Sequence, residues 1–283
     1  MDKIAVIADI HGNLTALEAV IEDIESRGID RIFCLGDMIG IGPSAHEVLN
    51  IIKDKCEVVI FGNLEKWLAE VDLGKEDREQ ERQRIIWNRS LLSEEENKYI
   101  KSLPMIHDMY ISGRLVRFMH SSPDNVFNKT YYIDDETDKI RLFLPTDNTS
   151  INKIADVVVY ADIHEQLLQN FYHRTLVNIG SVGNAIELVL DEKYNGDSKE
   201  TTNAMYCIIE GSIGKKENKT SIGFQLVRVP YNIEKELEIS SKKNMLEFEE
   251  YKEEITKGLY RNLNYLKIKY KQVRQMQGKR YMQ

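Results

Sequence analysis

Five short polar motifs occur along this chain, each directly after an apolar run that is typical of a β-strand. They carry seven polar residues: Asp9, His11, Asp37, Asn63, His120, Asp162 and His164. In open α/β sheets, ligands bind beyond the strand ends, where short loops converge. An Asp or His is costly inside a buried strand, whereas at a strand end it can meet a cation. The order of the motifs therefore predicts an α/β fold whose strand ends gather these side chains.

The chemistry of these side chains indicates metal binding. Carboxylates, imidazoles and an amide together suit hard or borderline divalent cations. Two adjacent divalent metals most often activate water for attack on phosphorus. Each motif alone is weak evidence, and a lone His120 is more often a hydrogen-bonded core histidine. Taken in order, the motifs predict a two-metal hydrolytic site.

Length and charge limit the other classes of function. The 283 residues, 42% of them hydrophobic, suffice for one large α/β domain with appended elements or for two small domains. The formal net charge is −8, although residues 261–283 contain Lys and Arg but no Asp or Glu. An acidic body disfavours bulk nucleic-acid binding. Without a long apolar run or a secretory pattern at the N-terminus, we expect no membrane segment and a cytoplasmic protein.

Strand and helix patterns alternate over the first third of the chain. The predicted order is a strand at 3–8, a helix at 13–27, a strand at 31–35, a helix at 44–53 and a strand at 57–61. This βαβαβ order implies parallel strands with right-handed crossovers. Residues 64–103 are charged and helix-prone, and we interpret them as a helical insertion beside the site. Further strands are expected at 106–111, 115–119, 157–160, 165–171, 175–177, 205–210 and 223–228, with an irregular segment at 124–154 that covers the site.

The chain is predicted to be helical from Ile233 onward. Apolar residues recur there every three or four positions, from Phe248 through Tyr251 and Ile255 to Val273, and form one stripe. We expect the stripe to pack on the body of the protein, and a helix pair in a homodimer is the alternative. The expected division is a main domain over 1–230 and a C-terminal helical extension over 231–283.

The motifs resemble those of the calcineurin-like metallophosphoesterase superfamily. The matching segments are Asp9-Ile10-His11-Gly12-Asn13, Gly36-Asp37, Gly40-Ile41-Gly42-Pro43, Gly62-Asn63, His120, His164 and the turn Asn178-Ile179-Gly180-Ser181. The similarity covers about residues 3–185. It is closest to small bacterial members similar to diadenosine polyphosphate hydrolases, and it implies a four-layer α/β/β/α sandwich.

The resemblance also implies a ligand set and a reaction. It places one metal on Asp9, His11, Asp37 and His164, and a second on Asp37, Asn63, His120 and Asp162. Asp37 is thereby expected to bridge two divalent cations, with Mn or Fe favoured and Mg or Ni as alternatives. Asp37, Asn63 and His120 are the expected catalytic residues. The implied reaction is hydrolysis of a small phosphodiester or nucleotide phosphoanhydride by a metal-activated water.

Two positions depart from the family pattern. Asp162 stands where the family usually has a histidine ligand, which leaves either an oxygen-richer second metal site or a weakened one. Leu64 stands where many relatives have a histidine that assists the leaving group, and general acid catalysis is typically worth about 10²–10⁴-fold. Its absence favours phosphoanhydrides or activated phosphodiesters. The alternatives are a catalytically silent metal-binding regulatory protein and a protein or small-molecule phosphomonoesterase.

Three further residues are candidates for contact with substrate phosphate because they lie near the ligand motifs in the sequence. They are Asn13, Arg117 and Asn125. A turn or surface role is the plainer interpretation of each. The expected partner is a small phosphate ester or a nucleotide.

Overall fold

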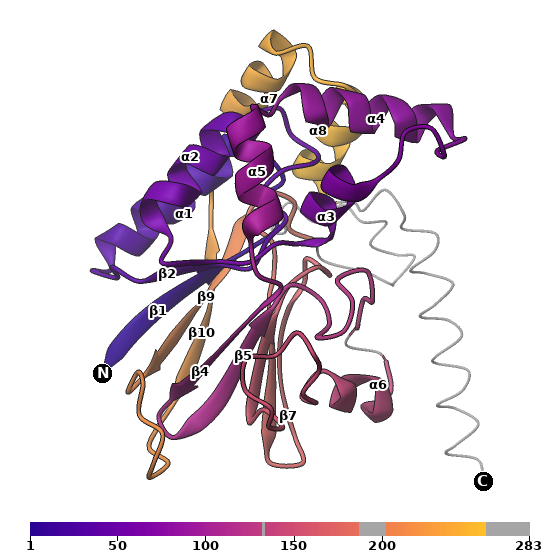
Figure 1. Cartoon of the computed structure of the whole chain (residues 1–283). Helices are drawn as coiled ribbons and strands as arrows, with labels where there is room; N and C mark the ends of the chain where they lie inside the picture. The colour runs from indigo at the N-terminus through magenta and orange to yellow at the C-terminus, as the bar shows by residue number, and fades with distance from the viewer. Residues whose placement is uncertain (132–133, 187–201, 259–283) are drawn as a thin grey trace, which may run out of the picture.

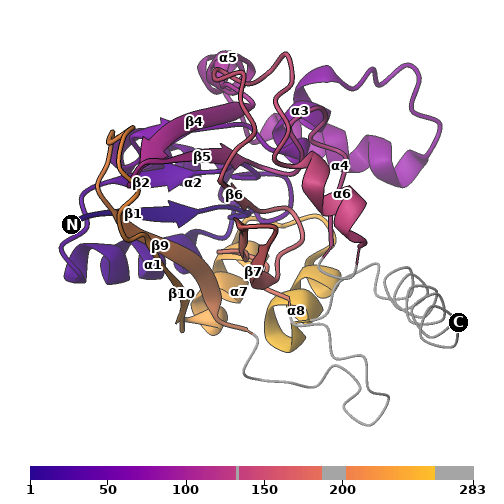
Figure 2. The same cartoon turned by 90° about the horizontal axis from the view of Figure 1, so that it is seen from below.

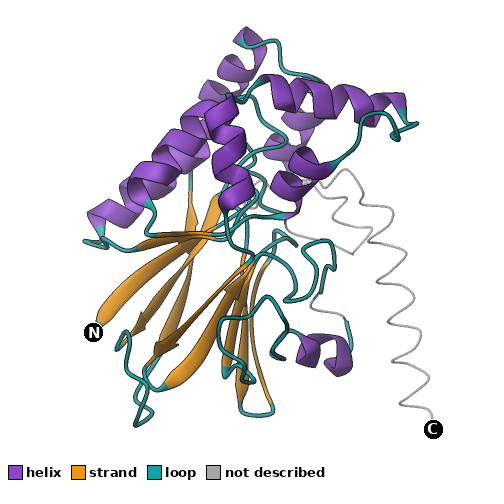
Figure 3. Cartoon of the chain, viewed as in Figure 1, coloured by secondary structure: helices purple, strands orange, loops and turns teal. Residues whose placement is uncertain are grey.

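Two five-stranded sheets packed face to face form the centre of the computed structural model, which describes residues 1–131, 134–186 and 202–258 (Figure 1). The first sheet has the strand order β10-β9-β1-β2-β3, and the second has the order β4-β5-β6-β8-β7. Apart from α6, the helices gather on one side of the strands (Figure 3). This arrangement confirms the predicted α/β sandwich.

The first sheet contains the predicted βαβαβ unit. The parallel strands are β1 (Asp2–Ile7), β2 (Ile32–Cys34) and β3 (Val58–Val59), connected by α1 (Leu14–Ser26) and α2 (Ala45–Lys55). The antiparallel strands β9 (Ala204–Gly211) and β10 (Gly223–Val229) extend the sheet on the other side of β1. The edge strand β3 is shorter than expected, and short edge strands limit unwanted pairing with other chains.

The second sheet places three further strands in parallel. Its strands are β4 (Ile106–Ile111), β5 (Arg114–Met119), β6 (Val157–Tyr160), β7 (Gln166–Phe171) and β8 (Arg174–Ile179). β5, β6 and β8 run parallel to one another. Their carboxyl ends therefore lie at one edge of the sheet, as the ends of β1, β2 and β3 do in the first sheet.

Three buried clusters hold the layers together. Val6, Phe33 and Phe118 belong to the cluster between the two sheets. A second cluster lies between the first sheet and α1 and α2, where apolar residues recur along each helix. On the outer face of the second sheet, Leu142 and Phe143 of the segment after α6 (Glu136–Arg141) pack on strand residues. The fourth layer is therefore thinner than expected, with one short helix and irregular chain.

The helical insertion and the C-terminal helices lie against the same end of the protein. The insertion forms α3 (Asn63–Glu70), α4 (Glu79–Ser90) and α5 (Glu94–Ser102), followed late in the chain by α7 (Ile233–Lys242) and α8 (Phe248–Lys257). Tyr251 and Ile255 of α8 are buried against Trp87 of α4 and Ile41. The described part of the apolar stripe thus packs on the body, as expected.

α7 lies beside α1 (Figure 2), and one buried carboxylate connects them. Glu236 accepts a hydrogen bond from the Thr15 backbone N–H at 3.2 Å and one from the Thr15 hydroxyl. Thr15 lies in the first turn of α1, where backbone N–H groups have no partner within the helix. The remainder of the stripe, the basic residues of 261–283 and the predicted dimer helix lie outside the described residues. Within the described ranges, no helix combines the length and apolarity needed to cross a bilayer.

Candidate metal centre

The fold gathers all seven strand-end residues into one cluster. Asp9 and His11 follow β1, Asp37 follows β2, Asn63 follows β3, His120 follows β5, and Asp162 and His164 follow β6. All of them are buried except Asn63, which is half-buried. Because both sheets direct their parallel strand ends to this point, residues 155 positions apart in the sequence meet in space.

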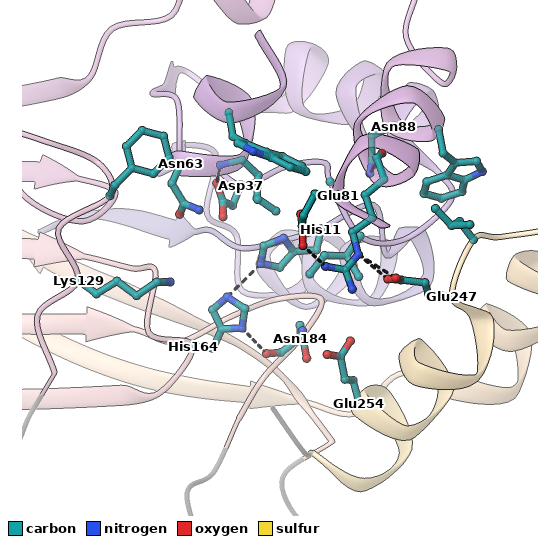
Figure 4. Close-up of a pocket in the computed structure, with 18 residues that line it drawn as sticks. His11, Asp37, Asn63, Glu81, Asn88, Lys129, His164, Asn184, Glu247 and Glu254 are labelled. Atoms are coloured by element: carbon teal, nitrogen blue, oxygen red, sulfur yellow. Dashed lines mark hydrogen bonds and ion pairs between the residues drawn. The ribbon is translucent and has the colours of Figure 1, made fainter. Parts of the chain in front are cut away.

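A first group of possible ligands consists of Asp9, His11 and His164. Asp9 Oδ1 lies 3.4 Å from His164 Nε2 and 3.6 Å from His11 Nε2. The two imidazole nitrogens lie 3.0 Å apart (Figure 4). The three ligand atoms all lie within 4.8 Å of one another, which is a spacing that one cation can serve.

A second group consists of Asp9, Asp37 and His120. His120 Nε2 lies 3.5 Å from Asp37 Oδ2, 3.9 Å from Asp9 Oδ1 and 3.7 Å from Asp162 Oδ1. The end of the Asn63 amide lies 2.9 Å from His120 Nε2 and 3.0 Å from Asp162 Oδ1. Asp9 is the carboxylate common to both groups, whereas the sequence predicted that Asp37 would be the ligand shared by the two metals. The bridging role of Asp37 stays a prediction.

The backbone at these positions is unusual. Five ligand candidates have left-handed φ angles: Asp9 at 52°, His11 at 53°, Asp37 at 49°, Asp162 at 68° and His164 at 61°. A non-glycine residue in this conformation costs roughly 1–3 kcal/mol and persists only where its surroundings enforce it. Such strain clusters at functional sites, and here it turns each side chain out of the strand direction toward the common centre.

Backbone carbonyls fix the ring orientation of two histidines. His120 Nδ1 lies 2.8 Å from the Leu35 carbonyl oxygen, and His164 Nδ1 lies 2.8 Å from the Asn184 carbonyl oxygen. A carbonyl oxygen only accepts hydrogen bonds, so each Nδ1 carries the hydrogen. Nε2 of each ring therefore faces the cluster, as it does in a metal-binding histidine.

Glu65 of α3 holds the loops that carry Asp37 and Asn63. Its buried carboxylate accepts hydrogen bonds from the backbone N–H groups of Asp37 at 2.7 Å, Met38 at 2.7 Å and Gly62 at 2.8 Å. Burial, together with the nearby Asp37 charge, raises the pKa of Glu65 to about 7. The sequence motifs did not reveal this supporting role of Glu65, because it depends on contacts across 28 residues.

The charges of the cluster call for a cation. Burial opposes ionisation of Asp9, but the imidazoles of His164 and His120 outweigh it and hold the Asp9 pKa below its usual range. Burial also opposes protonation of His120, yet Asp37 and Asp9 raise the His120 pKa to about 10. Burial and then His164 lower the pKa of His11 to about 4, which leaves that imidazole neutral and able to bind metal.

One atom tests directly whether the residues fit a metal. Asp9 Oδ1 is buried and has no hydrogen-bond partner among the described residues. A buried carboxylate oxygen without a partner is costly. The Nε2 atoms of three histidines lie within 3.9 Å of it. A divalent cation would satisfy the oxygen and the ring nitrogens together, so the residues fit the predicted cofactor.

Lys129 is a site residue that the sequence did not reveal. Its ammonium donates hydrogen bonds to the Asp162 carboxylate and, at 3.1 Å, to the Asp162 carbonyl oxygen. It belongs to the irregular segment predicted to cover the site, and it lines the cavity next to the cluster. No motif marks it, because a single lysine in a polar loop carries no signal. Its positive charge compensates the carboxylate that replaces the family's histidine at position 162.

The structure does not support Asn13 and Asn125 as phosphate ligands. The buried Asn13 caps α1 by accepting from the Ala16 N–H at 3.0 Å and donates to the Gly183 carbonyl oxygen at 3.0 Å. The exposed Asn125 accepts a turn hydrogen bond from the Phe127 N–H at 3.0 Å. Neither residue lines the cavity next to the cluster. Both are placed in the turn or capping roles that are common for asparagine.

The predicted substrate contact of Arg117 is wrong. Its fully buried guanidinium pairs with Asp108, with Nε at 2.9 Å and Nη2 at 3.1 Å from the two carboxylate oxygens. The remaining contacts go to backbone carbonyl oxygens of Phe143, Leu144, Ile151 and Lys153. The side chain points into the outer layer of the second sheet because residues alternate sides along a strand, and Arg117 lies three positions before His120.

Comparison with known proteins identifies the family. A family model described as the calcineurin-like phosphoesterase superfamily domain matches residues 2–189. The uncharacterized protein MJ0912 of Methanocaldococcus jannaschii is 31% identical over 246 residues, which cover 83% of this chain and 90% of that protein. This chain therefore belongs to the calcineurin-like phosphoesterase superfamily.

Two solved structures have a similar fold. A metallophosphoesterase from Sphaerobacter thermophilus aligns with a TM-score of 0.66 at 20% identity, covering 91% of this chain and 99% of that one. The hypothetical protein PH1004 from Pyrococcus horikoshii OT3 aligns with a TM-score of 0.69 at 20% identity, covering 92% of this chain and 99% of that one. Together they confirm the predicted fold, whereas the likeness to diadenosine polyphosphate hydrolases stays a prediction.

Proposed function

We propose that this protein is a divalent-metal-dependent hydrolase of a small phosphodiester or a nucleotide phosphoanhydride. The observation that carries the proposal is the unpartnered, buried Asp9 Oδ1 within 3.9 Å of three histidine Nε2 atoms. The cluster also opens onto a cavity of about 350 Å³, which His11, Asp37 and His164 help to line. A cation site beside a cavity of ligand size is what a small-molecule hydrolase requires.

The ligand residues divide between two cations in the proposed enzyme. Asp9, His11 and His164 would hold one, and Asp9, Asp37 and His120 would hold the other, with Asn63 and Asp162 adjacent to the second group. Mn²⁺ or Fe suits this mixture of imidazole and oxygen ligands, with Mg²⁺ or Ni²⁺ as alternatives. When bound, such ions polarise phosphoryl oxygens and lower the pKa of bound water.

The protein's own residues complete the proposed mechanism. The hydrogen bonds at Nδ1 of His120 and His164 keep both rings aimed at the cluster. Lys129 places an ammonium beside Asp162, where it can bind a phosphoryl oxygen. Leu64 lines the cavity with an apolar side chain where many relatives supply a proton donor. The leaving group therefore departs without an acid at this position, which favours phosphate leaving groups and weakly basic alcohols.

A second candidate function is a metal-binding regulatory protein without catalytic turnover. The observation that favours it is the contact between Lys129 and Asp162, because an ammonium beside this carboxylate competes with a cation there. The variant Lys129→Met separates the two candidates. If Lys129 only excludes the second metal, the variant binds one more Mn²⁺ per chain than the wild type. If Lys129 binds substrate phosphate, metal content stays constant and KM rises about tenfold.

The test combines metal analysis with turnover. We expect two Mn²⁺ per chain and hydrolysis of bis(4-nitrophenyl) phosphate or diadenosine tetraphosphate in preference to 4-nitrophenyl phosphate. Activity should disappear on chelation and return with added Mn²⁺. Absence of turnover with fewer than two metals per chain would favour the regulatory candidate instead. Preference for the monoester would favour a phosphomonoesterase.

A further inference from the structure

The cavity next to the metal centre extends well beyond the ligands. Its near end is formed by strand-end residues, and its far wall by residues of α3, α4, α8 and the loop before α8. In Figure 4, Asp37, His11 and His164 lie on one side, with Glu247 and Glu254 across the open space. The end of the cavity at the metal centre is therefore polar and suited to phosphate, whereas the opposite end is formed by helix residues and the loop before α8.

Aromatic side chains also line the cavity. The two tryptophans of the sequence, Trp67 on α3 and Trp87 on α4, both contribute to it. Phe127 joins them from the loop after β5 and is 49% exposed. Trp67 and Trp87 also pack on buried clusters, so part of their role is structural. The exposed Phe127 ring has no such explanation and presents a flat apolar surface to a ligand.

The charged groups of the far wall are mostly acidic. On this wall, Glu81, Glu247 and Glu254 line the cavity together with the guanidinium of Arg84. Arg84 donates to Glu81 at 2.8 Å and to the two Glu247 oxygens at 2.8 and 2.9 Å, so its charge is compensated within the wall. The Glu254 side chain is also buried at this end. Carboxylates repel a second phosphate group and accept hydrogen bonds from hydroxyl and amino groups.

We propose that the aromatic part of the cavity lining binds the uncharged, ring-bearing alcohol of a phosphodiester, of which a nucleoside is the fitting class, and that the acidic far wall disfavours a polyphosphate chain. The inference rests on the proposed function, because the phosphate must lie at the metal centre for the ring to reach these aromatic side chains. It narrows that function to a phosphodiester with one phosphate. A ring stacked on an aromatic side chain contributes about 1–3 kcal/mol, or roughly 5- to 150-fold in binding.

The decisive experiment compares two diesters with the same leaving group. Thymidine 5′-(4-nitrophenyl) phosphate and methyl 4-nitrophenyl phosphate differ only in the alcohol that remains on phosphorus. With the Mn²⁺-loaded enzyme, we expect kcat/KM to be at least about tenfold higher for the thymidine diester. In Phe127→Ala this ratio falls about threefold or more, through KM of the thymidine diester. A matched control is Leu168→Ala, which removes a 46% exposed apolar side chain outside the cavity and leaves the ratio unchanged.

Three results would overturn the inference while leaving the proposed function in place. They are equal kcat/KM for the two diesters, an unchanged ratio in Phe127→Ala, and higher kcat/KM for diadenosine tetraphosphate than for the thymidine diester. If neither the diesters nor diadenosine tetraphosphate are hydrolysed, the proposed function fails and tryptophan fluorescence decides the inference. Both tryptophans line the cavity, so thymidine 5′-phosphate should change the emission saturably where inorganic phosphate and tripolyphosphate do not. Equal responses to all three ligands would refute it.

Discussion

The strand-end cluster and the helical wall face each other across one cavity, yet they are built in opposite ways. The cluster consists of polar side chains on short loops, all but one of them buried, with left-handed backbone at five of its seven positions. The wall consists of ordinary helices, α3, α4 and α8, held by apolar contacts such as Tyr251 with Trp87. In the first region the fold enforces a strained geometry, and in the second the side chains simply pack.

This difference separates the chemistry of the protein from its choice of substrate. A strained ligand cluster tolerates few changes, because every position is fixed by several neighbours. Half-buried residues of the wall, such as Glu81 and Leu246, can change at less cost to stability. We expect substitutions in the cluster to remove metal binding outright, and substitutions in the wall to shift preference between substrates.

The largest expected effect comes from Asp9→Asn, which keeps the size of the side chain but removes the charge shared by both ligand groups. Loss of several kcal/mol of metal-based stabilisation corresponds to a fall in kcat of about 10³-fold or more. Metal content measured on the same sample should fall below one ion per chain. Asp30→Asn, an exposed acid remote from the strand ends, is the control. An active Asp9→Asn enzyme with full metal content would break the distinction between the two regions.

A smaller effect is expected from Glu65→Gln, which alters the support of the cluster without touching a ligand side chain. The amide replaces one acceptor oxygen with a donor facing backbone N–H groups of Asp37 and Gly62. Supporting residues of this kind typically change metal affinity about 10–100-fold, and a buried donor left unpaired costs about 1–3 kcal/mol of stability. Mn²⁺ titration and thermal unfolding measure both quantities. Glu70→Gln, at the exposed end of the same helix, should change neither.

The smallest expected effect concerns Glu236, which joins α7 to α1 away from the metal centre. Burial raises the Glu236 pKa above its usual 4.5, and hydrogen bonds from Thr15 only partly oppose the shift. The folded protein therefore binds this proton more tightly than the unfolded chain, so the group's contribution to stability is present below about pH 4.5 and declines as pH rises through the folded pKa.

The measurement compares the pH dependence of the free energy of unfolding in the wild type and in Glu236→Gln. The variant should lack this decline, so its stability relative to the wild type should increase as pH rises above 4.5. Metal content should be the same in both proteins. A parallel pH dependence in the two proteins would contradict the assignment to Glu236. A loss of metal in the variant would show that the helical layer and the cluster are coupled.

Much of the cluster was predictable, because a polar residue directly after an apolar run marks a strand end whatever the rest of the chain does. Asp9, Asp37, His120 and His164 were found in this way, and the structure brings them together. Arg117 was misplaced, because nearness in sequence does not say which side of a strand a residue faces. Lys129 was missed, because the conformation of an irregular loop depends on what it packs against.

Local pattern determined the βαβαβ order, the helical character of 64–103 and the identity of the ligand candidates, since each depends on residues within a few positions of one another. Only the tertiary structure decided that Asp9 is common to both ligand groups, that Glu65 holds two loops and that Lys129 neutralises Asp162. It also decided that aromatic and acidic residues of α3, α4 and α8 face the same cavity. Such contacts join segments tens to hundreds of residues apart, and their geometry follows from how the two sheets and their helices pack.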